Sequence, residues 1–334
     1  MQNIKIAING FGRIGRNLFR LLLNHPTIQV VAINDIADNK TMAHLLKYDS
    51  IHGVLPNKIS FTEQAIQVDN QNVLFFHERE ITHLDWKALD IDFVVESTGK
   101  FKTYDLAYQH IKAGAKRVIL SAPPEEDSIK TVVLGVNEAI LDGSELIVSN
   151  ASCTTNNAAP MIKIIKELCG IEQAFVTTVH SYTTDQSLHD QPHKDLRRAR
   201  GAAQSIIPTT TGAAKALTKI FPEYQGKIGG GGIRVPVPDG SLTDITCYVT
   251  NQVTEDEINA AFKKAAENEL KGILDYTTDP IVSVDVLGNT HSCLFDAQLT
   301  SCLDKMVKVV GWYDNEIGYS SRLIDLITFL HHKK

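Results

Sequence analysis

The chain has 334 residues and is 43% hydrophobic and 22% charged, a composition typical of soluble globular proteins. This length allows roughly two domains, each with its own core. The net charge of −6 at pH 7 gives the molecule no overall attraction to nucleic acids, which excludes nucleic acid as a primary partner. No apolar run approaches the length of a membrane span, and no leader precedes the first predicted strand. We therefore expect a cytoplasmic protein that does not associate with membranes.

Five cysteines are scattered along the chain, and none belongs to a C-x-x-C pair. This spacing predicts neither a disulfide framework nor a metal site. Free cysteine is most often a small buried core residue. We interpret four of the five in this way, namely Cys169, Cys247, Cys293 and Cys302, and consider Cys153 below.

The first half of the chain alternates between strand and helix patterns. Buried strands are predicted at residues 4–9, 28–34, 93–97, 117–121, 131–136 and 145–149. Residues 14–23 have the apolar composition of a buried helix, which Pro26 ends. Short apolar strands separated by helices indicate an α/β fold, in which a parallel sheet is doubly wound as in Rossmann domains.

The second half has a different pattern, with strands that follow one another without intervening helices. They are predicted at residues 175–182, 233–237, 244–249, 281–286, 294–299 and 306–312. Thr254 and Glu257 form a capping box that begins one helix, and residues 320–332 predict a C-terminal helix. We therefore expect a second, α+β catalytic domain with an antiparallel sheet. The predicted division is 1–150, joined by the helix 318–334, and 151–317.

A glycine-rich loop follows the first predicted strand and begins the first predicted helix. Its G-x-G-x-x-G pattern consists of Gly10, Gly12 and Gly15, and Arg13 and Ile14 lie between the last two, where they would face a ligand. Glycines allow the backbone to approach a pyrophosphate, and the helix N-terminus supplies free N–H groups. The pattern alone can also be a structural turn. Asp35, at the end of the second strand, favours a dinucleotide, and NAD over NADP, because a carboxylate binds ribose hydroxyls and repels a 2′-phosphate.

A cysteine at the predicted start of a helix is the best candidate nucleophile. Cys153 follows the strand that ends at Ser149 and precedes apolar residues at helical spacing. The N-terminal end of a helix lowers the pKa of a thiol, because its N–H groups and dipole stabilise the thiolate. Pro160 should kink this helix or begin its regular part. A buried structural cysteine is the alternative, and it is the more common role.

His180 ends an apolar strand and leads into the polar residues 181–186. A single histidine in such a place is more often structural than catalytic. Beside Cys153 it could act as the base that generates the thiolate and later accepts a hydroxyl proton. The sequence therefore offers a Cys–His pair as a hypothesis.

Six segments, taken in chain order, resemble the motif series of the glyceraldehyde-3-phosphate dehydrogenase family. They are INGFGRIGR, SNASCTTN, HSYTTDQ, DLRRARGAAQSIIPTTTGAAKA, RVPVPDGS and WYDNEIGYS, and they span nearly the whole chain. The resemblance implies a homotetramer of subunits that each have an NAD-binding and a catalytic domain. It also implies the oxidation of a phosphorylated aldehyde by NAD with uptake of inorganic phosphate, through a thiohemiacetal and a thioester.

The resemblance also implies roles for individual residues. Cys153 matches the nucleophile and His180 its base. The site for inorganic phosphate matches Ser152, Thr154, Arg198, Thr211 and Gly212, and the site for the phosphate of the substrate matches Thr183, Asp185 and Arg234. Cofactor contacts match Arg79, Thr98, Gly99 and Ser121, and Asn315 matches the residue that orients the nicotinamide carboxamide. At least one arginine of the basic run 194–200 would then point inward to bind phosphate.

Two other functions are left open by the sequence. Erythrose-4-phosphate dehydrogenase shares the nucleophile and resembles the chain at MAHLLKYDS and QSIIP, although Tyr182, Thr183 and Tyr313 favour the glyceraldehyde enzyme. A catalytically silent relative that binds RNA or a surface partner is disfavoured by the intact Cys–His pair and by the acidic net charge.

One position loosens the preference for NAD. Gln191 stands where NAD-specific relatives often have leucine, in a loop that can reach the adenosine of a neighbouring subunit. Pro192 and Asp35 still favour NAD over NADP.

Overall fold

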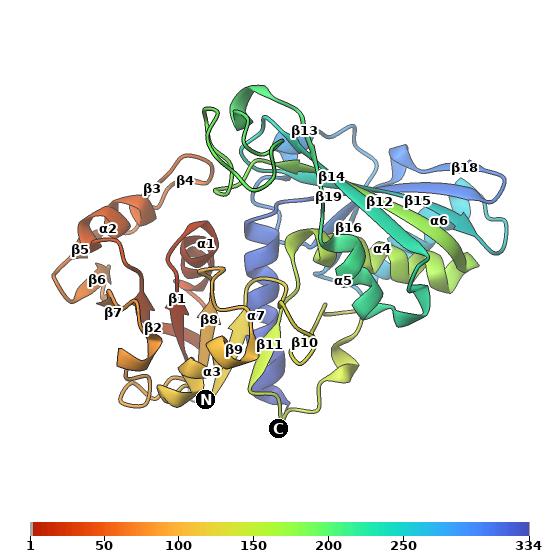
Figure 1. Ribbon diagram of the computed structural model, residues 1–334. Coiled ribbons are helices and arrows are strands. Elements are labelled where there is room, and N and C mark those ends of the chain that lie inside the picture. The colour runs from red at the N-terminus through yellow and green to blue at the C-terminus, as the bar shows by residue number, and fades with distance from the viewer. Residues whose placement is uncertain (1–2, 334) are drawn as a thin grey trace. The chain divides into compact units, whose positions relative to one another are not determined.

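The computed structural model describes residues 3–333, which form two compact units (Figure 1). Unit 1 contains the described residues up to 132, residues 138–151 and those from 320 onward. Unit 2 contains residues 133–137 and 152–319. Among the described residues, no helix is both long and apolar enough to cross a bilayer.

Unit 1 is built on a nine-stranded sheet with the order β10-β11-β9-β8-β1-β2-β7-β6-β5. The strands are β1 (Ile4–Asn9), β2 (Ile28–Asn34), β5 (Ile59–Phe61), β6 (Ala65–Val68), β7 (Gln71–Phe76), β8 (Phe93–Glu96), β9 (Arg117–Leu120), β10 (Lys130–Thr131) and β11 (Ile147–Ser149). All neighbours pair in parallel except β5 with β6 and β6 with β7. A hairpin of β3 (Tyr48–Asp49) and β4 (Gly53–Val54) stands apart from this sheet. The predicted parallel, doubly wound fold is confirmed for this unit.

The helices of unit 1 are α1 (Arg13–Leu22), α2 (Asn39–Lys47), α3 (Tyr104–Lys112) and most of α7 (Ile317–His332), with short 3-10 turns at Ile81–His83 and Glu138–Ile140. Two of these helices have a side-chain N-cap. Asp38 caps α2 and Thr103 caps α3, each by accepting a backbone N–H of the first turn. The segment from Ile81 to Ile91 packs against buried Ala and Val residues of the sheet around Trp86. These layers bury both faces of the parallel strands, as their continuous apolar sequences require.

Strand β1 lies at the point where the order of the sheet changes direction. The chain leaves β1 through α1 to pair with β1 on one side as β2, and it later returns on the other side as β8. Ligands of open parallel sheets bind beyond the carboxyl ends of the strands at such a point. The loops that begin at Gly10, Asp35 and Ser97 all follow these carboxyl ends.

Unit 2 contains an eight-stranded sheet with the order β13-β14-β12-β15-β19-β17-β16, and β18 pairs with β19. The strands are β12 (Ile171–Ser181), β13 (Ile207–Thr209), β14 (Ile228–Val235), β15 (Ser241–Val249), β16 (Leu274–Thr277), β17 (Cys293–Asp296), β18 (Ser301–Leu303) and β19 (Met306–Tyr313). The β12–β14 and β16–β17 pairs are parallel. The sheet is therefore mixed, and the predicted antiparallel sheet is wrong in these two places.

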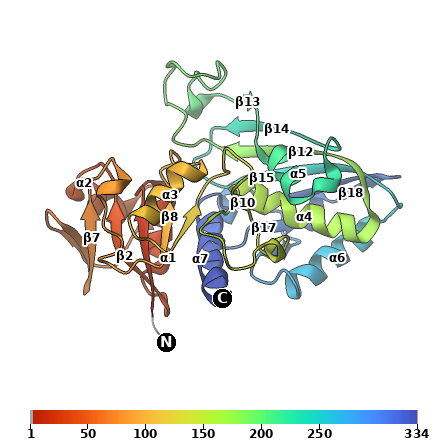
Figure 2. The same cartoon turned by 60° about the horizontal axis from the view of Figure 1, so that its bottom comes forward.

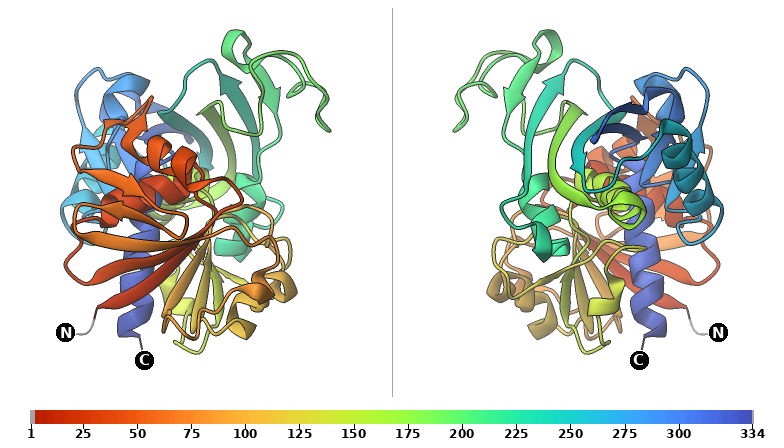
Figure 3. Two further views of the ribbon diagram at one scale, coloured as in Figure 1. Left: turned by 90° about the vertical axis from the view of Figure 1, so that its left-hand side faces the viewer. Right: turned by 90° about the vertical axis from the view of Figure 1, so that its right-hand side faces the viewer.

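Three helices contact unit 2's sheet: α4 (Cys153–Cys169), α5 (Ala213–Ile220) and α6 (Glu255–Glu267). Helix α4 contacts both other helices and four strands, so it is the central helix of this layer (Figures 2 and 3). The predicted capping box of Thr254 and Glu257 is confirmed at the start of α6. Short 3-10 turns occur at Ala202–Gln204, Pro222–Tyr224, Ser283–Val286 and Ala297–Leu299.

Several predicted strands are wrong or too long; the predicted strand 294–299, for example, ends at Asp296, and residues 297–299 form a 3-10 turn. Residues 281–286 include the 3-10 turn Ser283–Val286. The carboxylate of Asp285 accepts the N–H of Val282 at 2.8 Å, and this bond stabilises the turn. Val282 and Val284 are exposed, so the alternating valines do not mark a buried strand face. Of residues 131–136, only the first pairs in the sheet, as the end of β10.

Candidate active site

The glycine loop of unit 1 needs glycine at two of its three positions for steric reasons. Gly10 has a φ of +95°, and a Cβ there would lie 2.7 Å from the backbone nitrogen of Thr98. A Cβ on Gly15 would overlap the carbonyl oxygen of Gly10. At Gly12, which precedes the first residue of α1, a Cβ would meet nothing within 4 Å, and no side chain caps the helix. The loop can thus bring backbone and the N-terminus of α1 against a phosphate group.

Asp35 is held in place by two backbone N–H groups. Phe11 donates to one carboxylate oxygen at 2.7 Å, and Ala37 donates to the other at 3.0 Å. Each oxygen accepts only one of these bonds and keeps a lone pair for a further donor. The site can therefore accept hydrogen bonds from two ribose hydroxyls, which suits NAD.

The other predicted cofactor residues of unit 1 lie around the same strand ends. Arg13 binds the buried carboxylate of Asp49. Burial acts to raise the pKa of Asp49, but Arg13 and two backbone N–H groups hold it well below its usual range. The remaining residues lie in loops next to these: Ile14 in the first turn of α1, Arg79 after β7, Thr98 and Gly99 after β8, and Ser121 after β9.

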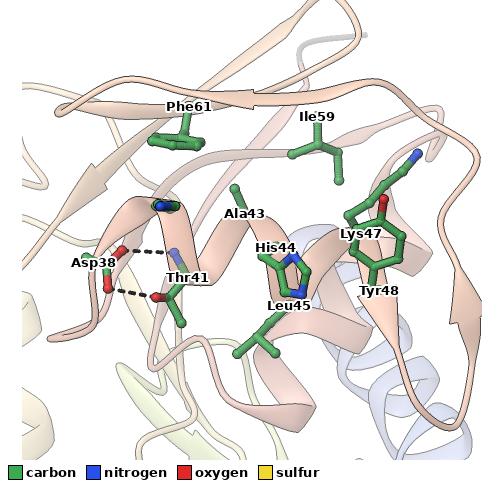
Figure 4. Close-up of a pocket in the computed structure, with 10 residues that line it drawn as sticks. Asp38, Thr41, Ala43, His44, Leu45, Lys47, Tyr48, Ile59 and Phe61 are labelled. Carbon is green, nitrogen blue, oxygen red and sulfur yellow. Dashed lines mark hydrogen bonds between the residues drawn. The ribbon is translucent and has the colours of Figure 1, made fainter.

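A pocket of about 710 Å³ opens elsewhere in unit 1, between α2 and β5. Figure 4 shows Phe61 and Ile59 facing the helix across it, with Asp38 bonded to the backbone and hydroxyl of Thr41 at 2.9 and 2.8 Å. None of the residues predicted to bind the cofactor lines this pocket. It is therefore separate from the glycine loop.

In unit 2, Cys153 is the first residue of α4. Ser152 caps this helix by accepting the N–H of Thr155 at 3.1 Å. Ala151, just before the cap, has a φ of +55°, a conformation that costs energy for any residue with a Cβ. The helix runs without a break through Pro160, so the prediction that its regular part begins at the proline is wrong.

The side chain of His180 reaches Cys153 from β12. The distance from Sγ to Nε2 is 3.5 Å, and His180 is buried whereas Cys153 stays partly exposed. Tyr313 packs with its ring edge-on to the imidazole, at 5.9 Å between the ring centroids. A thiol and an imidazole at this distance can exchange a proton directly.

Burial dominates the ionisation of this pair in the absence of ligands. It raises the pKa of Cys153 to about 11, although Arg234 and the backbone N–H of Thr154 oppose the shift. It lowers the pKa of His180 to about 3, and Arg234 adds to that shift. The helix N-terminus does act to lower the thiol pKa, through the backbone N–H of Thr154, but burial outweighs it in the unliganded protein. Burial thus favours the uncharged forms of both side chains.

Arg234 lies next to His180 because the two residues are partners in the β12–β14 pairing. Its Nη1 is 2.6 Å from His180 Nδ1 and 2.9 Å from the carbonyl oxygen of Ser181. His180 Nδ1 is also 2.8 Å from that same oxygen. A guanidinium only donates, so while it bonds to Nδ1 the imidazole must carry its proton on Nε2.

The two proposed phosphate sites share one carboxylate. Asp185 accepts a hydrogen bond from Arg198 Nη1 at 2.7 Å and another from the hydroxyl of Thr183. Burial acts to raise the pKa of Asp185, but the bond from Thr183 and the charges of Arg234 and Arg198 lower it. The two arginines are separated in sequence, yet Arg198 bonds to Asp185 and the charge of Arg234 also acts on it. Of the basic run, Arg198 points inward whereas Arg197 and Arg200 are exposed.

The remaining predicted phosphate residues already hold structural hydrogen bonds. The hydroxyl of Thr154 lies 2.9 Å from that of Tyr313, which also bonds to Thr178 at 3.0 Å. Thr211 accepts the N–H of Ala213 at 3.2 Å, and Gly212 precedes α5. Arg198 also donates to the hydroxyl of Thr209 and the carbonyl of Thr210, which places it beside this turn.

Asn315 follows β19 and is oriented by two serines. Its Oδ1 accepts hydrogen bonds from Ser181 at 2.9 Å and from Ser241 at 2.7 Å. Because both hydroxyls occupy the oxygen, the amide NH₂ faces the other way. No sequence motif marks Ser241 or the Tyr313–Thr178 contact. Their only signal is the register of β12, β15 and β19, which a sequence does not specify.

These features fit an oxidoreductase with a dinucleotide-binding unit and a second unit in which a candidate cysteine nucleophile, a histidine and two arginines come together. Residues 4–104 match the family described as glyceraldehyde 3-phosphate dehydrogenase, NAD binding domain. Residues 152–315 match the family described as glyceraldehyde 3-phosphate dehydrogenase, C-terminal domain.

Full-length relatives are similar to the chain over nearly all of its length. Glyceraldehyde-3-phosphate dehydrogenase 2 of Streptomyces avermitilis is 52% identical over 332 residues, which cover 98% of this chain and 99% of the relative. The Geobacillus stearothermophilus enzyme is 51% identical over 332 residues, covering 99% of each chain. The chain belongs to the glyceraldehyde-3-phosphate dehydrogenase family and is an NAD-dependent oxidoreductase.

Proposed function

We propose that the chain oxidises D-glyceraldehyde 3-phosphate with NAD and inorganic phosphate to 1,3-bisphosphoglycerate. The observation that carries this proposal is the Cys153–His180 pair at 3.5 Å, with Arg234 bonded to His180 and with Arg198 bonded to Asp185, on which the charge of Arg234 also acts. A covalent nucleophile suits aldehyde oxidation, and two cations suit a substrate and a co-substrate that both carry phosphate.

The first step is attack of the Cys153 sulfur on the aldehyde carbon. The thiol proton passes to His180 Nε2, the S–C bond forms, and the imidazolium returns the proton to the new alkoxide to give a thiohemiacetal. For Nε2 to accept a proton, Nδ1 must carry one and donate it to the carbonyl of Ser181, 2.8 Å away. Arg234 must then leave Nδ1, and the phosphate of the substrate can draw it away.

The second step removes the hydroxyl proton of the thiohemiacetal. His180 accepts this proton as the carbon is oxidised to a thioester on Cys153. NAD, when bound, supplies the hydride acceptor. In unit 1, the glycine loop and Asp35 would hold it. In unit 2, the amide of Asn315, fixed by Ser181 and Ser241, would orient the carboxamide.

The third step is attack of inorganic phosphate on the thioester carbon. Phosphate would be held by Arg198 and the turn at Thr211 and Gly212, with Ser152 and Thr154 at the start of α4. The C–S bond breaks, the acyl phosphate leaves, and the imidazolium of His180 reprotonates the thiolate. The energy of oxidation is thus kept in the acyl phosphate instead of being lost to hydrolysis.

A coupled assay of NADH formation tests this function. We expect turnover of D-glyceraldehyde 3-phosphate to depend on inorganic phosphate. Faster turnover of erythrose 4-phosphate, with release of a free acid and no need for phosphate, would assign the alternative activity. Absence of turnover with both aldehydes would support a catalytically silent binding protein.

We also propose that the chain acts as a cytoplasmic homotetramer. Unit 2 exposes large apolar side chains on and beside its sheet, namely Phe175, Leu188, Leu196 and Ile206. A concavity of about 730 Å³ lies among Phe175, Leu196 and Ile233. Exposed apolar surface of this kind is typical of subunit interfaces. Sedimentation analysis should give the mass of four chains, and Leu196→Glu should shift it toward smaller species, whereas a monomeric wild type would contradict the proposal.

A further inference from the structure

A chain of buried polar side chains crosses unit 1 beneath the proposed cofactor loops. Its members are nearly inaccessible to solvent, with exposed fractions of 0% for Trp86 and His110, 1% for Asn9, 3% for Glu96 and 4% for Asn34. Buried polar groups are costly unless they are hydrogen-bonded, and a fully bonded network holds its members in one arrangement. The network therefore has the properties of a rigid support.

The network begins at Trp86, which fixes the tautomer of His110. The indole Nε1–H donates to His110 Nδ1 at 3.1 Å. Because an indole nitrogen can only donate, Nδ1 must be the unprotonated acceptor. The proton of the neutral imidazole is then on Nε2, which lies 3.2 Å from Glu96 Oε2. His110 thus donates a directed hydrogen bond to Glu96.

Glu96, the last residue of β8, accepts hydrogen bonds from four donors. Its Oε2 accepts from His110 and from the amide of Asn9 at 2.5 Å. Its Oε1 accepts from the backbone N–H of Thr98 at 2.8 Å and from the hydroxyl of Thr98 at 2.5 Å. An ionised carboxylate can satisfy all four donors at once, whereas a neutral amide cannot.

The network continues from Asn9 to two further strand ends. Asn9 Oδ1 accepts from Asn34 Nδ2 at 2.7 Å. Asn34 in turn bonds to both backbone groups of Glu78, accepting at 2.8 Å and donating at 2.9 Å. One network therefore links the carboxyl ends of β1, β2 and β8 and the loop after β7. Gly10, Asp35 and Thr98 follow the ends of β1, β2 and β8 by one or two residues, and Arg79 directly follows Glu78.

We propose that Glu96 is a positioning residue for NAD, which fixes the spacing of these loops, and that His110 acts through Glu96. This inference rests on the proposed assignment of the loops to the cofactor. Glu96 itself is buried and does not face a ligand. Its effect on NAD is exerted through Thr98 and Asn9, so its loss should weaken NAD binding without altering the chemistry at Cys153.

The first test is Glu96→Gln, which keeps the shape of the side chain. In either orientation, the amide turns its NH₂ group toward two of the four donors. The hydrogen bonds to Thr98 are lost in one orientation, and those to Asn9 and His110 are lost in the other. We expect the Kd for NAD, measured by titration calorimetry on the full-length enzyme, to rise about tenfold or more. The kcat at saturating NAD and the rate of Cys153 alkylation without NAD should stay close to wild type.

His110 offers a test of positioning against simple stability. Gln in its place can still donate an N–H from nearly the position of Nε2, whereas Phe fills the space without a donor. If both variants lose similar thermal stability, His110→Gln should keep an NAD affinity nearer to wild type than His110→Phe. Equal affinity in the two variants would overturn the role of His110.

Arg117→Leu is the matched control, because Arg117 lies at the opposite, amino end of β9. It bonds to the carbonyls of Leu330 and Gly143, so its loss should lower the melting temperature of unit 1. We expect its Kd for NAD to stay unchanged. If Glu96→Gln lowers the melting temperature as Arg117→Leu does and leaves the Kd unchanged, Glu96 is only structural and the inference is wrong. Failure of the wild type itself to bind NAD would instead contradict the proposed cofactor site.

Discussion

The buried polar groups of the two units differ in how they are satisfied. In unit 1, Glu96 has four donors, and the tautomer of His110 is fixed by Trp86. In unit 2, Arg234 and the carbonyl of Ser181 both lie within hydrogen-bond distance of His180 Nδ1. A network in which every donor has its own acceptor favours one stable arrangement. A group with two competing hydrogen-bond partners, such as His180 Nδ1, has at least two arrangements. The hydrogen bonds of Glu96 thus favour a single arrangement of the loops in unit 1, whereas those of His180 in unit 2 leave two arrangements open, between which a bound ligand could select under the proposed mechanism.

Removing the nucleophile should have the largest effect on this comparison. Cys153→Ser should lower aldehyde oxidation by about a thousandfold or more, because a hydroxyl is far less nucleophilic than a thiol. NAD binding should be retained, since the proposed cofactor loops are in unit 1. Limiting iodoacetamide followed by peptide mapping should label Cys153 first in the wild type, because it is partly exposed and His180, 3.5 Å away, can take its proton during the reaction despite the raised pKa of the thiol. Earlier labelling of the partly exposed Cys302, or near-normal activity of Cys153→Ser, would contradict the covalent mechanism.

Replacing His180 should have the second-largest effect on activity. His180→Asn should lower kcat by roughly 10²–10⁴-fold, the usual contribution of a general acid–base group. It should also slow the alkylation of Cys153. In the unliganded wild type, the pKa of Cys153 is raised to about 11, so alkylation should accelerate steadily as pH rises from 7 to 10. A rate that is already maximal at pH 7 would show that the thiolate is formed without ligand.

The two arginines sharpen the comparison within unit 2. Loss of a charge-assisted hydrogen bond costs roughly 1.5–3 kcal/mol, so each variant should lose about 10- to 150-fold in one kinetic parameter. Arg234→Leu should chiefly impair use of the phosphorylated aldehyde, and Arg198→Leu should chiefly raise the requirement for inorganic phosphate. Some overlap is expected because the charges of both arginines act on Asp185. Indistinguishable steady-state profiles would count against separate phosphate sites.

In unit 1, Asp35 should control the choice of cofactor. Asp35→Gly removes the acceptor for the ribose hydroxyls and the repulsion of a 2′-phosphate. The ratio of kcat/KM for NADP to that for NAD should rise roughly tenfold, the size of one such interaction. Asp38→Ala, which removes the cap of α2 nearby, serves as a control and should leave the ratio unchanged. If Asp35→Gly also leaves it unchanged, Asp35 does not contact the ribose.

The smallest effect on activity is expected from a change at Asp239, a buried carboxylic acid of unit 2 that lies near the charges of Asp314 and Glu316. Burial, with the charges of Asp314 and Glu316 next, raises the pKa of Asp239 to about 9, against about 4 in an unfolded chain. The folded state therefore binds the proton more tightly. The stability that results is fully present below pH 4 and is lost as pH rises toward 9. Asp239→Asn should abolish this loss, so its gain in unfolding free energy over wild type should grow between pH 5 and 9 in urea titrations.

The sequence predicted the parts of the fold that local chemistry decides. Strands β1 and β2 and the capping box at Thr254 were predicted with correct bounds, because apolar runs and caps act over a few residues. The parallel pairing of β12 with β14 was missed, since the glycine run 229–232 has no strand pattern and pairing depends on distant residues. The valines of residues 282–286 were misread as a strand because alternation does not show that a face is buried.

The candidate site divides in the same way. The position of Cys153 at a helix start and of the glycine loop after the first strand could be predicted, because each stands in a distinctive local context. The raised pKa of Cys153 was not, since it depends on burial by residues far apart in the chain. The role of Glu96 was likewise invisible, because its partners Asn9 and His110 lie 87 and 14 residues away.

Helix α7 belongs mostly to unit 1 although it is the last element of the chain. Leu323, Leu326, Ile327 and Leu330 on this helix are buried. When the first 151 residues have emerged from the ribosome, the part of α7 that completes the core of unit 1 has therefore not yet been synthesised. The cofactor-binding half must wait, incomplete, while the whole of unit 2 is synthesised, and it closes only after the final turn emerges. Unit 1 therefore cannot finish folding before unit 2 has been synthesised. A prematurely terminated chain should expose the apolar surface that α7 would cover, and it should be removed by proteolysis.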